Sequence, residues 1–454
     1  MIKSINPATD AEIKSYKEME LSEIEEIISS ADNTFNEWHR SSLSTRSQML
    51  KKAGGILRKD KEMHSRLMTE EMGKPIAQSR SEVEKCAWLC DYFADNGGEF
   101  LKDRIVESDA SKSFVTFQPL GVVLAVMPWN FPYWQVFRFA VPGLMAGNAG
   151  VLKHASNVSG CALAIEGVFR EAGFPVNLFR ALIVSSKKME KVIELEKIRA
   201  VTLTGSVPAG KAVASKAGSL IKKTVLELGG SDPYVVLEDA DLETAAETCV
   251  TSRLLNGGQS CIAAKRFIIV EKVYDEFRDL FVEKMKAKKM GDPFDESNDL
   301  GPQATKSLRD DLHDQVKRSI DKGAKLLLGG MIPESKGAYY PPTVLENVKE
   351  GMAAYDEELF GPVASLIKAK NEADAVRIAN DSIFGLGAAV FTNNIKRGER
   401  IAREELNAGN CFVNAFVKSD PRLPFGGVKE SGYGRELSWF GIQEFVNIKT
   451  VYVK

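Results

Sequence analysis

Histidine and cysteine are scarce in this chain of 454 residues, which contains only four histidines and six cysteines. The histidines lack the spacing of metal ligands, and Cys86 with Cys90 fit one apolar helix face better than a metal clamp. The cysteines are scattered, without the pattern of a secreted disulfide scaffold. The sequence therefore predicts no metal site and a reducing compartment.

A net charge of one sign is also missing, because 60 Lys and Arg residues nearly balance 62 Asp and Glu residues. The bulk charge therefore offers nothing that would attract nucleic acid or an anionic membrane. No uninterrupted apolar stretch approaches the length of a bilayer span, and residues 1–7 contain no long apolar core. We expect a soluble, cytoplasmic protein without nucleic-acid or membrane partners.

The dinucleotide fingerprint Gly-x-Gly-x-x-Gly is absent, since the Gly-x-Gly segments at 385–387 and 432–434 lack the third glycine. The segment from Gly205 to Lys211 matches the first seven positions of a phosphate-binding P-loop. The eighth position is Ala212, which lacks the hydroxyl that would hold magnesium. A P-loop NTPase centred on Lys211 is one alternative hypothesis, and a helix N-terminus that receives a pyrophosphate is another use of the same turn.

The sequence does contain the composition of a large folded enzyme, with 44% hydrophobic and 27% charged residues. Its length exceeds what one hydrophobic core usually organises, so two or three structural units are expected. Helical spacing of apolar residues extends from about Leu21 to Gly98, and Ser22 with Glu25 forms a capping-box pattern at its start.

From Leu120 onward, short apolar runs alternate with helical patterns, which predicts parallel sheets with crossover helices. The first series of strand-like runs comprises residues 122–126, 150–153, 181–184 and 201–204. A second series has strand-like runs at 234–237 and 266–270, with a helical pattern at 241–255 between them. Residues 447–454 alternate like an extended strand, which often pairs with another element or another subunit.

Cys261 ends the segment Asn-Gly-Gly-Gln-Ser-Cys, a loop that follows a predicted helix. The two glycines permit unusual backbone geometry, so that N–H groups beside Cys261 can face a reacting oxygen. A cysteine is the strongest side-chain nucleophile near neutral pH, and its attack on an aldehyde would give a thiohemiacetal. A buried structural cysteine is the alternative interpretation.

Two further segments carry groups that suit such chemistry. Glu227 lies among apolar neighbours at the end of a strand-like run, where its pKa would rise and it could accept a proton from water. Asn130 follows the strand predicted at 122–126, and its amide could donate to an oxyanion. A helix cap or ion pair is the alternative for Glu227, and a local turn hydrogen bond is the alternative for Asn130.

Taken together, these motifs resemble the aldehyde dehydrogenase superfamily. The matching segments are Pro-Trp-Asn at 128–130, Glu-Leu-Gly-Gly at 227–230, Gly-Gln-Ser-Cys at 258–261, Glu-Leu-Phe-Gly-Pro at 358–362 and residues 424–432. The resemblance spans nearly the whole chain. It implies that Cys261 is the nucleophile, that Asn130 and the Cys261 N–H hold the oxyanion, and that Glu227 activates the water that hydrolyses a thioester.

The resemblance also implies a bound nicotinamide dinucleotide. Lys153 would lie near its adenosine ribose, and Glu358 near its nicotinamide ribose. The full set of implied cofactor-binding residues is Trp129, Lys153, Ser156, Gly205, Ser206, Glu358 and Phe360.

Ser156 stands where other members carry a glutamate that bonds the adenosine ribose hydroxyls. A carboxylate there would repel a 2′-phosphate, whereas Ser156 can donate to it beside Lys153. The sequence therefore favours NADP, with NAD possible.

Residues 129–138 and 417–422 look like the bacterial succinate-semialdehyde dehydrogenase branch. Arg138 would meet the far carboxylate of a short semialdehyde, with Ser419 and Trp134 beside it. An ion pair on a helix surface is the alternative for Arg138. A different short or aromatic aldehyde, and an inactive binding protein of the same fold, are alternatives for the function.

The resemblance implies an α/β subunit with two parallel-sheet domains and a β oligomerisation arm. The cofactor-binding domain is predicted at 1–99 and 119–226, the catalytic domain at 227–420 and the arm at 100–118 and 432–454. A homodimer or tetramer is expected, in which the tail strand extends the sheet of a neighbouring subunit.

Overall fold

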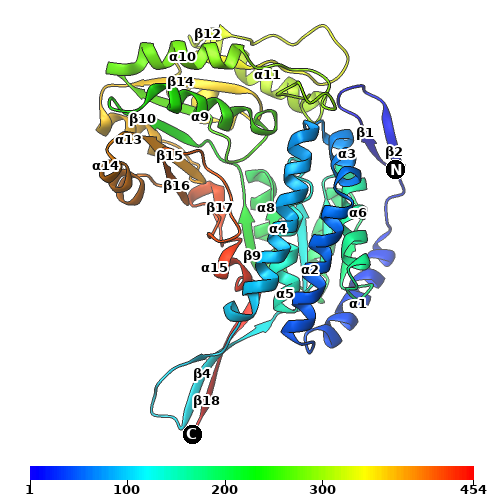
Figure 1. The fold of residues 1–454 in the computed structure, drawn as a ribbon. Helices are drawn as coiled ribbons and strands as arrows, with labels where there is room; N and C mark the ends of the chain where they lie inside the picture. Colours follow the sequence, from blue (N-terminus) through cyan, green and yellow to red (C-terminus); the bar gives the residue numbers. More distant parts are fainter.

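The computed structural model describes residues 1–454 and opens with a β hairpin followed by four helices (Figure 1). These elements are β1 (Ile2–Ile5), β2 (Glu12–Tyr16), α1 (Leu21–Trp38), α2 (Leu43–Lys59), α3 (Lys61–Met72) and α4 (Ile76–Phe100). The predicted capping box is wrong: the N-cap is Glu20, whose backbone N–H donates to Glu23 at 2.7 Å. Ser22 already lies inside α1 and therefore cannot cap it.

A six-stranded sheet forms the first α/β unit, in the order β17-β9-β8-β5-β6-β7. Its strands are β5 (Val122–Met127), β6 (Ala149–His154), β7 (Phe179–Ala181), β8 (Ile198–Thr204), β9 (Lys223–Glu227) and β17 (Gly432–Tyr433). The crossover helices are α5 (Trp134–Ala146), α6 (Ser159–Glu171), α7 (Met189–Glu194) and α8 (Val207–Ser219). All neighbours are parallel except β17, which pairs antiparallel with β9. The predicted strand at 181–184 is misplaced, because β7 ends at Ala181.

A seven-stranded sheet forms the second unit, in the order β12-β13-β14-β11-β10-β15-β16. Its strands are β10 (Pro233–Val236), β11 (Arg266–Val270), β12 (Lys325–Leu328), β13 (Thr343–Glu346), β14 (Val363–Ala369), β15 (Gly387–Phe391) and β16 (Asn410–Val413). Its helices are α9 (Leu242–Leu254), α10 (Tyr274–Lys286), α11 (Lys306–Asp321), α12 (Ala353–Asp356), α13 (Glu372–Asn380) and α14 (Ile395–Arg400). Val235 and Val236 belong to two different hydrophobic clusters, so both faces of this sheet are buried.

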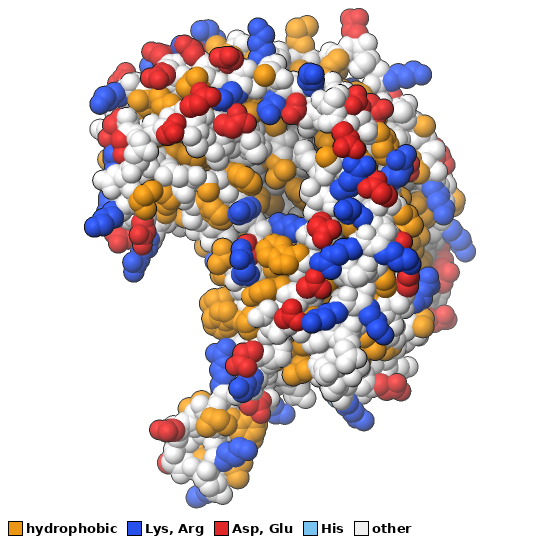
Figure 2. Space-filling model, viewed as in Figure 1, with side chains coloured by type: hydrophobic (Ala, Val, Ile, Leu, Met, Phe, Trp, Pro, Cys, Tyr) orange, Lys and Arg blue, Asp and Glu red, His pale blue; other side chains and the backbone are white.

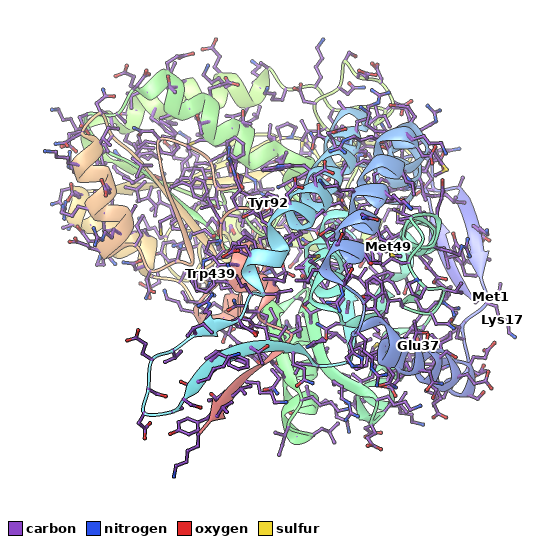
Figure 3. The ribbon with its side chains drawn as sticks, turned by 60° about the horizontal axis from the view of Figure 1, so that its bottom comes forward. Met1, Lys17, Glu37, Met49, Tyr92 and Trp439 are labelled. Carbon is purple, nitrogen blue, oxygen red and sulfur yellow. The ribbon has the colours of Figure 1, made fainter.

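A three-stranded antiparallel sheet forms an arm that extends away from the body (Figure 1). It consists of β3 (Arg104–Ile105), β4 (Lys112–Pro119) and β18 (Val446–Val453). Trp439, in the short helix α15 (Ser438–Ile442), lies at the base of the arm with its ring 5.3 Å from the Arg104 guanidinium (Figure 3). The predicted α/β architecture with a β arm is confirmed. The domain boundaries stay a prediction, although β17 lies in the six-stranded sheet and not in the arm.

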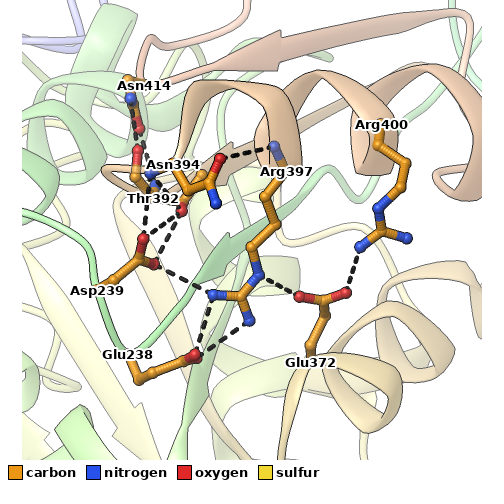
Figure 4. Close-up of polar contacts among 8 residues, drawn as sticks. All are labelled: Glu238, Asp239, Glu372, Thr392, Asn394, Arg397, Arg400 and Asn414. Carbon is orange, nitrogen blue, oxygen red and sulfur yellow. Dashed lines mark hydrogen bonds and ion pairs between the residues drawn. The ribbon is translucent and has the colours of Figure 1, made fainter.

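A network of charged side chains fastens α14 to the second sheet (Figure 4). Arg397 on α14 bonds Glu238 and Asp239, which lie shortly after the end of β10, and Glu372 at the start of α13. Asp239 in turn accepts hydrogen bonds from the hydroxyl group of Thr392, at 2.8 Å. The end of β10 is thus tied to two helices.

None of the helices in the chain combines the length and the apolar character required to cross a bilayer.

Candidate active site

The polar groups predicted from four motifs meet at one edge of the six-stranded sheet. Strands β9, β8, β5 and β6 are adjacent and parallel, so their carboxyl ends lie side by side. Glu227 ends β9, Gly205 follows β8, Asn130 follows β5 and Lys153 lies near the end of β6. The topology therefore gathers residues that lie up to about a hundred positions apart in the sequence.

The loop that carries Cys261 crosses this edge from the second unit. After α9 the backbone takes a left-handed turn at Asn256, with φ of 55°, and its side-chain amide donates to the Asn130 carbonyl at 2.7 Å. Glycine is required at Gly258, because a Cβ there would collide with the Gly361 carbonyl oxygen. A Cβ on Gly230 would lie 2.6 Å from the Cys261 carbonyl oxygen. The glycines of two motifs thus allow the loop to pack against the turn after β9.

Two cavities meet at Cys261. One, of about 250 Å³, is lined by a set of residues that includes Trp129, Asn130, Gly205, Ser206, Glu358 and Phe360. The other, of about 220 Å³, is lined by a set of residues that includes Trp134, Arg138 and Ser419. Cys261 lines both cavities. Five of the seven predicted cofactor residues therefore line one cavity, the three predicted substrate residues line the other, and Cys261 lies between them.

Asn130 lies beside the Cys261 loop with its side chain almost fully buried. Its Nδ2 donates to the carbonyl of Gln259 at 3.2 Å, which holds the amide against the loop. An amide nitrogen carries two hydrogens, so a second N–H remains for an oxyanion near Cys261.

Glu227 is 2% exposed, and neither of its carboxylate oxygens has a hydrogen-bond partner. Burial raises its pKa well above the ordinary value, and the nearby carboxylate of Glu436 raises it further, while Arg138 acts in the opposite direction. The charge of Glu227 also raises the pKa of Cys261, so the two groups interact. A buried carboxyl group with a raised pKa is suited to accept a proton from water once it is ionised.

Burial raises the pKa of the Cys261 thiol to about 12, and the cations Arg138 and Lys265 oppose that rise. Lys265, which no motif had indicated, donates to the carbonyl oxygens of Ser260 and Cys261 at 2.8 and 2.6 Å. Its Nζ also lies 3.3 Å from a carboxylate oxygen of Glu358. Lys265 therefore links the loop of Cys261 to the wall of the larger cavity.

Among the predicted cofactor residues, the Phe360 and Trp129 rings pack edge to face, with centroids 5.7 Å apart. Lys153 is buried and forms no ion pair or hydrogen bond through its side chain, and burial lowers its pKa. Ser156 is exposed at the start of a short helical turn. Lys153 and Ser156 both lie beyond the residues that line the larger cavity.

The glycine turn after β8 does not form a P-loop. Ser206 is the N-cap of α8, and its hydroxyl makes no cap hydrogen bond, so backbone N–H groups at this helix end remain free. Lys211 lies within α8 and pairs with Glu430 at 2.9 Å. The P-loop alternative is therefore unsupported, because its lysine is engaged elsewhere on the surface.

Arg138 lies in the smaller cavity but is not a free cation. It is 2% exposed, and its Nη2 lies 2.7 Å from a carboxylate oxygen of Glu436. The helix α5 begins at Trp134, four residues after Asn130, and it is buried along its whole length. The alternative of an exposed surface ion pair is therefore wrong, although an ion pair does exist. No sequence motif had indicated Glu436 as the partner of Arg138.

Comparisons with known proteins agree with this geometry. The model of the aldehyde dehydrogenase family matches residues 1–451. A Synechocystis protein named probable succinate-semialdehyde dehydrogenase (NADP+) is 48% identical, and the match covers 100% of this chain and 99% of the Synechocystis chain. An Escherichia coli succinate semialdehyde dehydrogenase (NAD(P)+) is 47% identical, and the match covers 99% of this chain and 97% of the Escherichia coli chain. The crystal structure of succinic semialdehyde dehydrogenase from Streptococcus pyogenes, in complex with NADP+, is 36% identical with a TM-score of 0.98 over 100% of both chains.

Proposed function

The chain belongs to the aldehyde dehydrogenase family, and on that premise we propose that it oxidises succinate semialdehyde to succinate, with NADP as the favoured cofactor. The observation that carries the proposal is the position of Cys261 at the junction of two cavities. One cavity is lined by five of the seven residues implied for the dinucleotide, and the other contains cationic and hydroxyl groups that suit an acidic aldehyde. The names of the similar proteins support the same substrate and cofactor.

In the proposed mechanism, the sulfur of Cys261 attacks the aldehyde carbon to form a thiohemiacetal. Asn130 Nδ2 and the Cys261 backbone N–H donate to the resulting oxyanion. Loss of hydride from the thiohemiacetal carbon leaves a thioester on Cys261, and a dinucleotide, when bound, would supply the acceptor for that hydride. Glu227 then takes a proton from the water that attacks the thioester, and the acid leaves as the thiol is restored.

The residues present fit a phosphorylated dinucleotide. The free N–H groups at the start of α8, next to Gly205 and Ser206, suit a pyrophosphate. Glu358 lines the larger cavity, where it suits ribose hydroxyls. Lys153 is a buried cation without an acidic partner, and Ser156 follows it closely in the chain. A 2′-phosphate would provide the missing counter-charge.

We also propose a homodimer or tetramer that acts in the cytoplasm. Strand β18 exposes Ile448 at 60% and Tyr452 at 51%, and hydrophobic atoms are visible along the arm (Figure 2). An exposed apolar strand of this kind favours pairing with a second subunit. The cysteine usage supports a reducing compartment.

The proposal is tested by the rates with succinate semialdehyde and with butanal, each measured with NADP and with NAD. We expect kcat/KM to be at least about tenfold higher for the semialdehyde, because only this substrate presents a carboxylate to the cationic cavity. Succinate should also inhibit competitively. Equal or higher kcat/KM for butanal would show that another aldehyde is the substrate.

The cofactor proposal is tested by Ser156→Glu. The new carboxylate should lower kcat/KM with NADP by about 10- to 100-fold by repelling the 2′-phosphate, and the effect with NAD should be much smaller. Ser219→Glu, at the far end of α8, adds the same charge as a control. An unchanged ratio of NADP to NAD activity in Ser156→Glu would contradict the assignment.

A further inference from the structure

Lys85 on α4 is a cation without an acidic partner in the smaller cavity. Its Nζ lies 4.1 Å from the centroid of the Trp134 ring and 3.0 Å from the hydroxyl oxygen of Ser419, to which it donates. This is the one hydrogen bond of its side chain, and Lys85 takes part in none of the ion pairs of the chain. Lys85 and Cys261 line the same cavity of about 220 Å³.

Ser419 is 7% exposed, and its hydroxyl oxygen already accepts two hydrogen bonds. One comes from Lys85 and the other from the indole Nε1 of Trp134, each at 3.0 Å. A hydroxyl oxygen has two lone pairs, so Ser419 can act toward a ligand only as a donor through its O–H. Nε of Arg138 is another buried donor without an acceptor. The cavity therefore presents several donors to a ligand, beside one buried acceptor without a partner, the amide oxygen of Gln135.

The acidic groups near Lys85 are engaged by other partners. Glu82, one helical turn before it, pairs with the buried Lys74 and accepts backbone N–H groups from the start of α5. Asp420 is held by Arg422 at 2.7 Å. Neither carboxylate forms an ion pair with Lys85. The positive charge in the cavity is thus available to an incoming anion.

We propose that Lys85 is a specificity-determining residue, which forms an ion pair with the far carboxylate of the semialdehyde while the hydroxyl of Ser419 donates to the same group. This inference rests on the proposed function. Arg138 already has Glu436 as its counter-charge, whereas Lys85 has none. The carboxylate of the substrate would therefore be attracted more strongly by Lys85 than by Arg138.

The titration of Lys85 gives this role a pH signature. Burial lowers its pKa to about 8, and Arg138 acts in the same direction, while Cys86, Glu82 and Asp420 act in the opposite direction. Lys85 is charged below this value and loses its proton as the pH rises through it. The KM for the semialdehyde should therefore increase from about pH 7 to about pH 10, and the KM for butanal should not follow that increase.

The experiment compares Lys85→Met, which keeps most of the length but removes the charge, with Lys85→Arg. For Lys85→Met we expect the ratio of kcat/KM for succinate semialdehyde to that for butanal to fall by about 10- to 100-fold, mainly through KM. Lys85→Arg should retain most of the ratio. Lys51→Met removes a surface lysine that pairs with Asp95 on α4, and it should leave the ratio unchanged.

The outcomes separate this inference from the proposed function. If the wild type does not prefer the semialdehyde, the proposed function fails. If the wild type prefers it and Lys85→Met keeps that preference, only the role of Lys85 fails. A KM for the semialdehyde that stays flat with pH in the wild type would also overturn the role, and that measurement does not depend on the folding of any variant.

Discussion

Cys261→Ala is expected to abolish aldehyde oxidation, with a decrease in kcat of about 10⁴-fold or more. Without the sulfur, no thiohemiacetal forms, and a free aldehyde is a poor hydride donor. Neither of the two cavities offers a second cysteine to replace it. The measurement is the aldehyde-dependent formation of reduced cofactor under saturating conditions.

Cys411→Ala is the matched control, because Cys411 is also partly exposed but lies on β16, with its sulfur directed to the carbonyls of Leu406 and Ala408. This variant should retain its activity. Cys261→Ala should still bind NADP, since the cofactor residues are unchanged, and this shows that the variant folds. Activity in Cys261→Ala within tenfold of the wild type would contradict the nucleophile assignment.

The sequence predicted the parts of the fold that depend on local patterns. The apolar runs became β5, β6, β8, β10 and β11, because strands buried on both faces read as continuous apolar segments. The same logic misplaced the strand at 181–184. Leu182 and Val184 are buried in the core, but the chain leaves the sheet after Ala181. Burial alone therefore does not define a strand.

The charged groups of the site were harder to predict, because their partners are distant in the chain. Lys85 and Ser419 are 334 positions apart, and Arg138 meets Glu436 across almost three hundred positions. Before the fold is known, Lys85 reads as an ordinary helix lysine and Glu436 as a surface acid. Arg138 could be placed near the substrate from its motif, but the sequence could not show that its charge was already balanced.

Glu227→Gln is expected to separate the two halves of the reaction. The amide has the shape of the carboxyl group but cannot accept a proton from water, so hydrolysis of the thioester should slow by about 10²- to 10⁴-fold. Attack by Cys261 does not require this proton transfer. A rapid burst of reduced cofactor, close to one per active site, should therefore precede a slow steady state, and stopped-flow absorbance would record both phases.

The pH dependence follows from the raised pKa of Glu227. The carboxyl group is protonated at low pH and accepts a proton only when ionised, so the wild-type rate of thioester hydrolysis should rise with pH until Glu227 is ionised. This limb should be absent in Glu227→Gln. Because the pKa of Glu227 is raised in the folded state, ionisation of this carboxyl group opposes folding above the ordinary pKa of a glutamate. Glu227→Gln removes this unfavourable contribution, so the loss of the ionisable group should not lower the thermal stability of the variant.

Glu430→Gln, which removes an exposed carboxylate paired with Lys211, is the matched control. Loss of the burst together with the steady state would place Glu227 before acylation instead.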